Sequence, residues 1–493
     1  MAAETVDVII VGAGLSGLTA AREVQRAGYS CVVLEAEDRV GGMLLSVYQD
    51  SDSGNSKVAV DVGAAWLNDT TQSAIWGLVQ RYGLTTETQD SEGELLREME
   101  DGSIITGTEG NKKASTMSSF YATLGALVST IDPAAPHTHP DAASLDRITL
   151  AQFCAQHTST PLVSLLLNAS VRYLVGAEAS AVSALWFLAH CAAGSGLQNM
   201  MSARAGGGQH LRVREGTQRI ALGLAGELAP GTVHLSTAVA CIEQSSSSSV
   251  TVTASGGRAF HARRAILALP STLHNTIAFR PAPLPPAKQR LADAAAAAAA
   301  AGTGFFAKAT LVYDRPWWRD NDNANAPAGP LNGIFESVLG PVVYSRNTNV
   351  PALGHWSITG SVVGAPGARW GAIADREGRR RAVVEQLRNG FGAALEGGRD
   401  GVPEPVAYVE GLWTGRYAAG GGSVPVLGPG VLTAVGAAAV EPFGRVHFVG
   451  SETAVAWRGY MEGAVRSGLR GAEEVVAALG KEMEGGLQAA GKL

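Results

Sequence analysis

The chain is poor in cysteine and in long apolar runs, and each shortage excludes a class of protein. Its 493 residues include four cysteines, Cys31, Cys154, Cys191 and Cys241. They are too few and too scattered for a disulfide framework or a cysteine-based metal site. No uninterrupted apolar stretch reaches the roughly twenty residues that a membrane-spanning helix needs. We therefore expect neither a bound metal nor a membrane span.

Positive charge is also scarce. The 38 basic residues are outnumbered by 44 acidic ones, and the net charge is −6. The one dense basic run, Arg379–Arg381, lies in a segment with the pattern of an amphipathic helix. Nucleic acid is therefore not an expected partner. No signal peptide precedes the first apolar segment, so we do not expect secretion. Residues 491–493 approximate the Ser-Lys-Leu peroxisomal signal, which leaves a cytoplasmic and a peroxisomal location open.

The N-terminal region combines a buried strand, a glycine-rich turn and a helix. Val8 to Val11 form a continuous apolar run, as in a parallel strand buried on both faces. Gly12, Gly14 and Gly17 then give the pattern G-x-G-x-x-G. The first glycine allows a tight turn, the second lets the backbone approach a pyrophosphate, and the third lets helix and strand pack closely. The helix N-terminus presents free N–H groups to the phosphate.

An acidic residue ends the next apolar strand, Cys31–Leu34. Glu35 is placed there to accept hydrogen bonds from an adenosine ribose. Strand, glycines, helix, strand and acid in this order predict a dinucleotide-binding unit. Arg39 and the pair Gly41-Gly42 follow, giving E-x-x-x-R-x-G-G, for which a charged turn after a strand is the less favoured alternative.

This arrangement resembles the FAD-binding start of the flavin amine oxidase family, and the chain is similar in its motifs to animal and fungal monoamine oxidases. In that family the arginine and the second glycine pair approach the pyrophosphate. The family usually continues with Arg or Lys where this chain has Met43, so the resemblance implies FAD with one phosphate contact fewer. The resemblance runs from about Glu4 to Leu479.

Later segments resemble other cofactor contacts of the family. Gly63–Trp66 matches a segment whose small residues let the backbone lie against the flavin ring, although a plain strand end is an alternative. The family contacts adenine at the position of Val239. A glutamate at the position of Glu452 bonds the ribityl or ribose region, although an acid at a helix start is an alternative. The resemblance implies cofactor contacts at Gly12, Gly14, Leu15, Ser16, Gly17, Glu35, Ala36, Arg39, Gly41, Gly42, Gly63, Ala64, Ala65, Trp66, Val239, Ala268, Trp413, Gly450, Ser451, Glu452, Tyr460 and Met461.

A lysine stands among apolar neighbours in residues 305–313, which have the pattern of a strand. Its even-numbered positions, which include Phe306 and Lys308, share one face. A buried lysine needs a partner. The family holds a water against flavin N5 with a lysine here, and the resemblance implies that role for Lys308. The alternative is a lysine that reaches solvent from an edge strand.

Residues 145–204 have helical periodicity and resemble the family's substrate domain. Trp186, Phe187 and His190 could line a cavity there, but we favour a helix core for them. His190 has no ligand pattern near it, so a metal role is not expected.

The chain departs from animal monoamine oxidases at the flavin-linking position. Alignment on Pro429-Gly430 puts Gly422 at the family's flavin-bonded cysteine and Ser423 at a tyrosine of its aromatic cage. Glycine has no sulfur, so we expect non-covalent FAD. Tyr460 would supply the surviving cage wall, unless it is an ordinary helix-cap aromatic, with Trp413 near the flavin edge. Loss of the rigid tyrosine predicts a wider pocket that accepts branched or long amines. The implied catalytic set is Lys308, Tyr460, Trp413 and Ser423.

The expected fold class is α/β, in a two-domain α+β arrangement. A Rossmann-type FAD-binding domain is interleaved with a substrate domain of mixed sheet and helices. The expected limits are 1–85, 212–290 and 430–480 for the FAD domain, 86–211 and 291–429 for the substrate domain, and 481–493 for a C-terminal tail.

The expected function is that of an FAD-dependent monoamine oxidase. A small amine and O2 would give an aldehyde or ketone, ammonia and hydrogen peroxide, with monomer or homodimer left open. A polyamine or L-amino-acid oxidase is an alternative, although no arginine for a substrate carboxylate is identifiable in the sequence. An alternative from another class is a flavin-binding scaffold or sensor without turnover, and the presence of Lys308 disfavours it.

Overall fold

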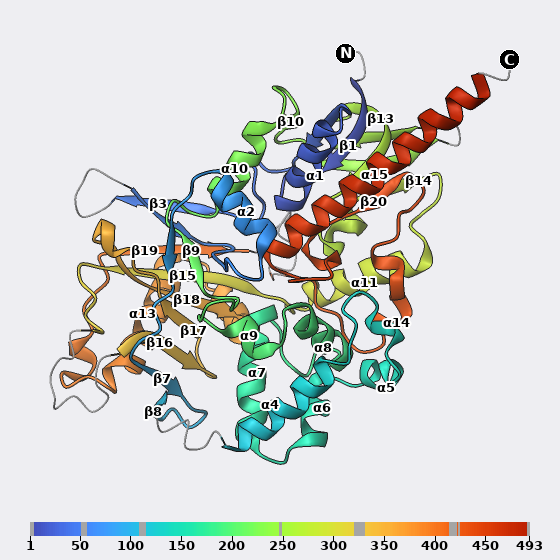
Figure 1. Ribbon diagram of the computed structural model, residues 1–493. Helices are drawn as coiled ribbons and strands as arrows, with labels where there is room; N and C mark the ends of the chain where they lie inside the picture. The colour runs from blue at the N-terminus through green and yellow to red at the C-terminus, as the bar shows by residue number, and fades with distance from the viewer. Residues whose placement is uncertain are drawn as a thin grey trace.

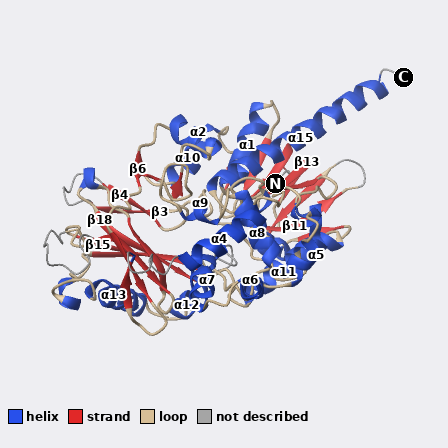
Figure 2. Ribbon diagram, turned by 60° about the horizontal axis from the view of Figure 1, so that its bottom comes forward, coloured by secondary structure: helices blue, strands red, loops and turns tan. Residues whose placement is uncertain are grey.

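Two sheets and a group of helices make up the structure, which is a computed structural model (Figure 1). It describes residues 4–50, 57–107, 115–245, 249–319, 331–413, 422 and 424–490. In Figure 2 one sheet lies at each side, with helices between and around them. The expected fold class is confirmed.

The first sheet has eight strands, in the order β10-β2-β1-β13-β12-β11-β14, with β20 also paired to β13. Its members are β1 Glu4–Val11, β2 Cys31–Leu34, β10 Val233–His234, β11 Val239–Gln244, β12 Val250–Ala254, β13 Ala259–Leu267, β14 Ala278–Arg280 and β20 Val446–Phe448. Residues Val8–Val11 of β1 are buried on both faces, which explains their unbroken apolar run. Val8 and Ile10 pack with helix α1 (Leu15–Arg26) and helix α15 (Met461–Ala490), whereas Ile9 packs on the opposite side.

The second sheet has seven strands, in the order β19-β15-β18-β17-β16-β7-β8. They are β7 Glu94–Glu98, β8 Ile104–Thr106, β15 Phe306–Tyr313, β16 Leu331–Ser337, β17 Val342–Asn347, β18 Trp356–Val363 and β19 Ala407–Leu412. The β16–β7 pair is parallel and the other pairs are antiparallel, so the sheet is mixed. One face, with Ala307, Ala309 and Leu311, packs in a core with Phe391 of helix α13 (Arg376–Gly392).

Short strands and helices connect the two sheets. The short strands are β3 Ser46–Asp50, β4 Lys57–Asp61, β5 Trp66–Leu67, β6 Thr86–Thr88 and β9 Leu211–Val213. The helices are α2 Ser73–Arg81, α4 Ser115–Val128, α5 Ala142–Arg147, α6 Leu150–His157, α7 Pro161–Val175, α8 Ala184–Ala193, α9 Leu197–Met201, α10 Gln218–Glu227, α11 Pro286–Ala300, α12 Gly364–Gly371 and α14 Leu432–Val435. Helix α8 is core: Trp186 and Phe187 are 3% and 0% exposed, which confirms the favoured interpretation. His190 stacks on Trp186 at 5.5 Å, and burial lowers its pKa to about 3.

Helix α15 covers residues 481–490 of the segment expected as a C-terminal tail. Helix α15 runs without a break to Ala490, and Figure 1 shows it leaving the body of the molecule beside α1. Glu482 holds this part of the helix against the first sheet. Its carboxylate pairs with Arg263 and Arg264 of β13 and with Arg445, which precedes β20. The domain limits stay a prediction. Within the described residues, no helix is both long and apolar enough to cross a membrane.

Candidate active site

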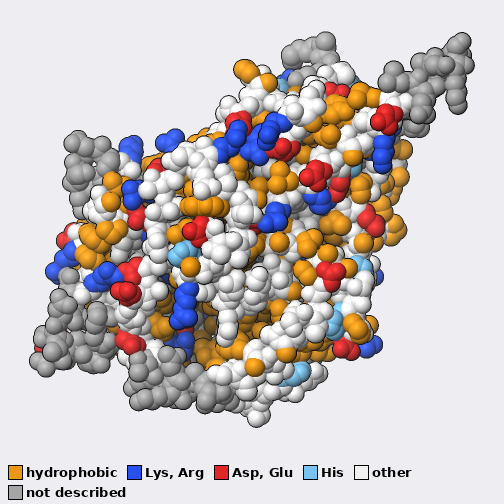
Figure 3. Space-filling view, in the orientation of Figure 1, with side chains coloured by type: hydrophobic (Ala, Val, Ile, Leu, Met, Phe, Trp, Pro, Cys, Tyr) orange, Lys and Arg blue, Asp and Glu red, His pale blue; other side chains and the backbone are white. Residues whose placement is uncertain are grey.

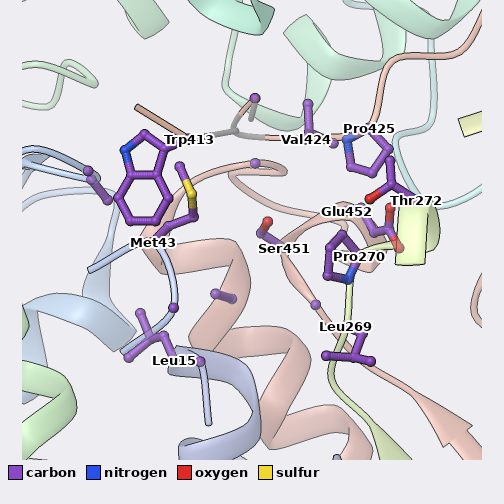
Figure 4. A pocket seen from close by; sticks show the side chains of 18 of the residues that line it. Leu15, Met43, Leu269, Pro270, Thr272, Trp413, Val424, Pro425, Ser451 and Glu452 are labelled. Atoms are coloured by element: carbon purple, nitrogen blue, oxygen red, sulfur yellow. The ribbon is translucent and has the colours of Figure 1, made fainter. Parts of the chain in front are cut away.

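A cavity of about 370 Å³ lies between the two sheets. It is lined by every residue expected at the cofactor except Gly17. Lys308 and Gly422 also line it, whereas Ser423 lies outside the described residues. Figure 4 shows Trp413 and Met43 on one side of the cavity and Pro425, Thr272 and Glu452 on the other. Over the face in Figure 3, acidic and basic side chains are interspersed with apolar ones.

The glycine-rich turn expected to bind the pyrophosphate presents backbone atoms to the cavity. Gly12 has φ +104°, in the left-handed region that favours glycine, and a Cβ there would lie 2.8 Å from the Ala268 carbonyl oxygen. A Cβ at Gly14 would meet nothing within 4 Å, so its cavity side is open to a ligand. A Cβ at Gly17 would lie 2.0 Å from the Gly12 carbonyl oxygen. Gly17 therefore serves close packing of α1 on the strand end, and it does not line the cavity.

Glu35 lies at the end of β2 with one backbone donor on each carboxylate oxygen. It accepts hydrogen bonds from Ala13 N at 2.7 Å and from Glu37 N at 2.9 Å. Burial raises its pKa, and these two bonds oppose the rise. A carboxylate has about four acceptor sites, so acceptor capacity remains for a ribose hydroxyl. Arg39 is held by an ion pair to Glu37 at 2.8 Å.

Lys308 is 2% exposed and points its ammonium group at the turn after β4. Its Nζ donates to the carbonyls of Gly63 at 2.5 Å and Asp61 at 3.3 Å, and lies 4.5 Å from the Trp66 ring centre. Burial lowers the lysine pKa to about 8, against the attraction of the Asp61 carboxylate. Strand β15 is paired on both sides, by β18 and β19, so the edge-strand alternative is wrong.

Two aromatic side chains border the same region. The Trp413 indole donates to the Val62 carbonyl at 2.8 Å, and a Cβ at Gly63 would lie 2.7 Å from the indole. Tyr460 precedes α15 and packs edge-on against Trp457, with ring centres 5.0 Å apart. Burial raises the pKa of the Tyr460 phenol, so the hydroxyl stays neutral.

Glu452 is fixed at the boundary of the cavity. Both carboxylate oxygens accept from Ser271, one from its backbone N–H and one from its hydroxyl, each at 2.9 Å. Burial raises the Glu452 pKa to about 7, against these bonds and the attraction of Lys288 and Arg458.

The comparisons agree with this geometry. The family described as flavin containing amine oxidoreductase matches residues 15–476. The chain belongs to this family. It is 30% identical to the flavin-containing amine oxidase B of Homo sapiens over 488 residues, covering 96% of this chain and 87% of the relative.

Two solved structures have the same architecture. A cyclohexylamine oxidase from Brevibacterium oxydans is 27% identical, with a TM-score of 0.83 over 96% of this chain and 99% of that one. A putrescine oxidase bound to putrescine is 25% identical, with a TM-score of 0.83 over 97% and 100%. The chain is thus an FAD-dependent amine oxidase that uses O2 to deaminate amines.

The cavity fits the family's FAD. Gly63 leaves no room for a side chain, because a Cβ would lie 1.9 Å from the Met43 carbonyl oxygen. A flat ring can therefore approach the backbone there. At the other end, the open side of Gly14 and the N-terminus of α1 suit a pyrophosphate.

Sequence reasoning missed three polar residues at the far end of the cavity, which is the end where Lys308 lies, away from the glycine-rich turn. Tyr173, Gln209 and Ser361 line it, from α7, the loop before β9, and β18. The Tyr173 hydroxyl donates to Gln209 Oε1 at 3.2 Å. The available signal was weak: Thr359 and Ser361 alternate with apolar residues in a fully buried strand.

Proposed function

We propose that the chain oxidises the neutral form of a primary amine at the end of the cavity formed by Lys308, Trp66 and Tyr460. The balanced reaction is R–CH2–NH2 + O2 + H2O → R–CHO + NH3 + H2O2. FAD, when bound, accepts the hydride equivalent from the α-carbon and passes the electrons to O2. The observation that supports this placement is Lys308, buried at the cavity beside Gly63 with two carbonyl partners.

The side chains at this end select and hold the substrate. Nearby cations disfavour a further positive charge, so the buried Lys308 and the half-buried Arg212 favour the neutral amine over the ammonium ion. Trp66, Trp413 and Tyr460 present large apolar surfaces to an alkyl or cyclic group. Lys308 is proposed to hold a water toward the flavin N5 side.

We propose that FAD is bound without a covalent link, because Gly422 lines the cavity where the animal enzymes resembled in sequence carry cysteine. Acid precipitation should then release the flavin into the supernatant. A yellow pellet would contradict the proposal.

The test of activity is peroxide release by the purified yellow protein. We expect peroxide and ammonia in equal amounts from aliphatic or cyclic monoamines, with slower release from diamines such as putrescine. A protein that holds FAD but releases peroxide with no amine, polyamine or amino acid would favour the scaffold or sensor alternative.

Two further hypotheses rest on sequence alone. A homodimeric assembly is one, testable by light scattering. The other is a cytoplasmic or peroxisomal location, the latter through residues 491–493, which lie outside the described residues.

A further inference from the structure

A buried arginine with an unpaired nitrogen lies near the polar end of the cavity. Arg346, in β17, is 3% exposed. Its Nη2 donates to the Met201 carbonyl at 3.1 Å, and the guanidinium lies 4.9 Å from the Tyr344 ring centre. Its Nε is buried and has no hydrogen-bond partner among the described residues. An unused buried donor is costly unless a ligand supplies the acceptor.

The strand register puts Arg346 on the same sheet face as Lys308. Lys308 pairs with Ser361, and Ser361 pairs with Tyr344. Paired residues of antiparallel strands share a face, and so do residues two apart along a strand. Lys308 and Ser361 both line the cavity, so this face is the one that meets it. From the usual strand spacing and rise, the Cα atoms of Lys308 and Arg346 lie roughly 12 Å apart.

Positive charge exceeds negative charge at this end. Among the described residues Arg346 forms no ion pair. The carboxylate of Glu336 attracts Arg346, but it is already paired with Arg97 at 2.5 Å. A second arginine, the half-buried Arg212, donates to two backbone carbonyls at 3.2 and 2.7 Å. The half-buried Asp61 attracts both Lys308 and Arg212. An anion would be stabilised beside such a surplus.

Arg346 does not itself line the cavity, and two cavity-lining side chains connect it to the cavity. Tyr173 and Gln209 both line it and are hydrogen-bonded to each other. Gln209 Nε2 donates to the Met200 carbonyl at 3.3 Å, next to the Met201 carbonyl that binds Arg346. The guanidinium of Arg346, the amide of Gln209 and the phenol of Tyr173 therefore lie close together at the C-terminal end of α9.

We infer that this end of the cavity binds a carboxylate carried by the amine substrate, with Arg346 as its counter-ion. The inference rests on the proposed function and names a substrate class for it. Because Arg346 and Lys308 are two strands apart, the carboxylate lies several bonds from the reacting carbon. The preferred substrate is thus an ω-amino acid. Oxidation of its terminal amine gives an ω-oxo acid, which carries an aldehyde at one end and the carboxylate at the other.

The test compares two substrates of equal chain length, 5-aminopentanoate and pentylamine. In the wild type, kcat/KM for 5-aminopentanoate should exceed that for pentylamine. Arg346→Met should lower this ratio roughly 10- to 100-fold, the range for one lost hydrogen bond to a charged group. Arg172→Met is the matched control, because Arg172 does not line the cavity either, and its charge is already paired with Glu178 while it bonds the Val338 carbonyl. Its ratio should stay within twofold of the wild type.

A binding measurement separates this inference from the activity itself. Pentanoate should perturb the flavin absorption of the wild type, and Arg346→Met should weaken its binding at least tenfold, with Arg346→Lys in between. If neither amine is oxidised, the proposed function fails, while pentanoate binding still tests Arg346. Equal kcat/KM for both substrates in the wild type, or unchanged pentanoate binding in Arg346→Met, would overturn the inference.

Discussion

The phosphate end of the cavity is made of backbone, whereas the far end is made of side chains. At the first, Gly12, Gly14 and Gly41 come from two nearby turns, and what matters is the absence of Cβ atoms. At the second, Lys308 and Gln209 reach the cavity from different elements, about a hundred residues apart. We therefore expect the cofactor to be held by local geometry. Substrate choice should depend on side chains that can be changed without disturbing that geometry.

The largest expected effect breaks the phosphate end. Gly17→Val puts a side chain where a Cβ already lies 2.0 Å from the Gly12 carbonyl oxygen, so α1 must move off the strand. We expect about 3 kcal/mol or more of lost stability and loss of bound FAD. Gly77→Ala in α2 is the control, because a Cβ there meets nothing within 4 Å, and it should be neutral or slightly stabilising. Urea unfolding and flavin absorption measure both. Retained FAD in Gly17→Val would refute the packing argument.

A smaller effect is expected at the far end. Lys308→Met should slow reoxidation of the flavin by O2 roughly 100-fold, with less change in its reduction by amine, because a preorganised cation is removed. Lys288→Met is the matched control: Lys288 is also buried with its pKa lowered to about 8, but it bonds the Ala438 carbonyl away from the cavity lining. Stopped-flow traces of both variants decide the matter. Equal slowing in the two would show a general structural effect.

A change of a few fold is expected at Ser423, which lies outside the described residues. Ser423→Tyr restores the cage wall of the animal enzymes, so it should narrow the pocket beside the reactive carbon. The expected result is a lower kcat/KM for branched amines relative to benzylamine. An unchanged ratio would mean that Ser423 does not border the substrate.

The smallest effect concerns Glu452, which lines the cavity. Its folded pKa of about 7 lies above the ordinary value of 4.5, so the folded chain binds more protons between these values. Its contribution to stability is present at acid pH and is lost as pH rises from about 4.5 to about 7. Glu452→Gln should flatten this part of the pH dependence of Tm in flavin-free protein. A slope equal to that of the wild type would assign it to other groups.

The sequence by itself determined the cofactor unit. The run Val8–Val11, the spacing of Gly12, Gly14 and Gly17, and Glu35 after a strand predict a βαβ turn, because each contact lies within a few residues along the chain. The strand around Lys308 was equally readable from its alternation.

Only the tertiary structure decided which side chains meet at the far end. Whether β15 is an edge or an interior strand depends on pairing with strands 50 and 100 residues away, which alternation does not encode. The same holds for Arg346: its own strand shows a lone arginine, and only the register with Ser361 puts it on the cavity face. The contacts of helix α15 in this segment are also long-range, because Glu482 forms ion pairs with Arg263, Arg264 and Arg445. Local periodicity sets the faces of each element, and long-range packing sets what those faces contact.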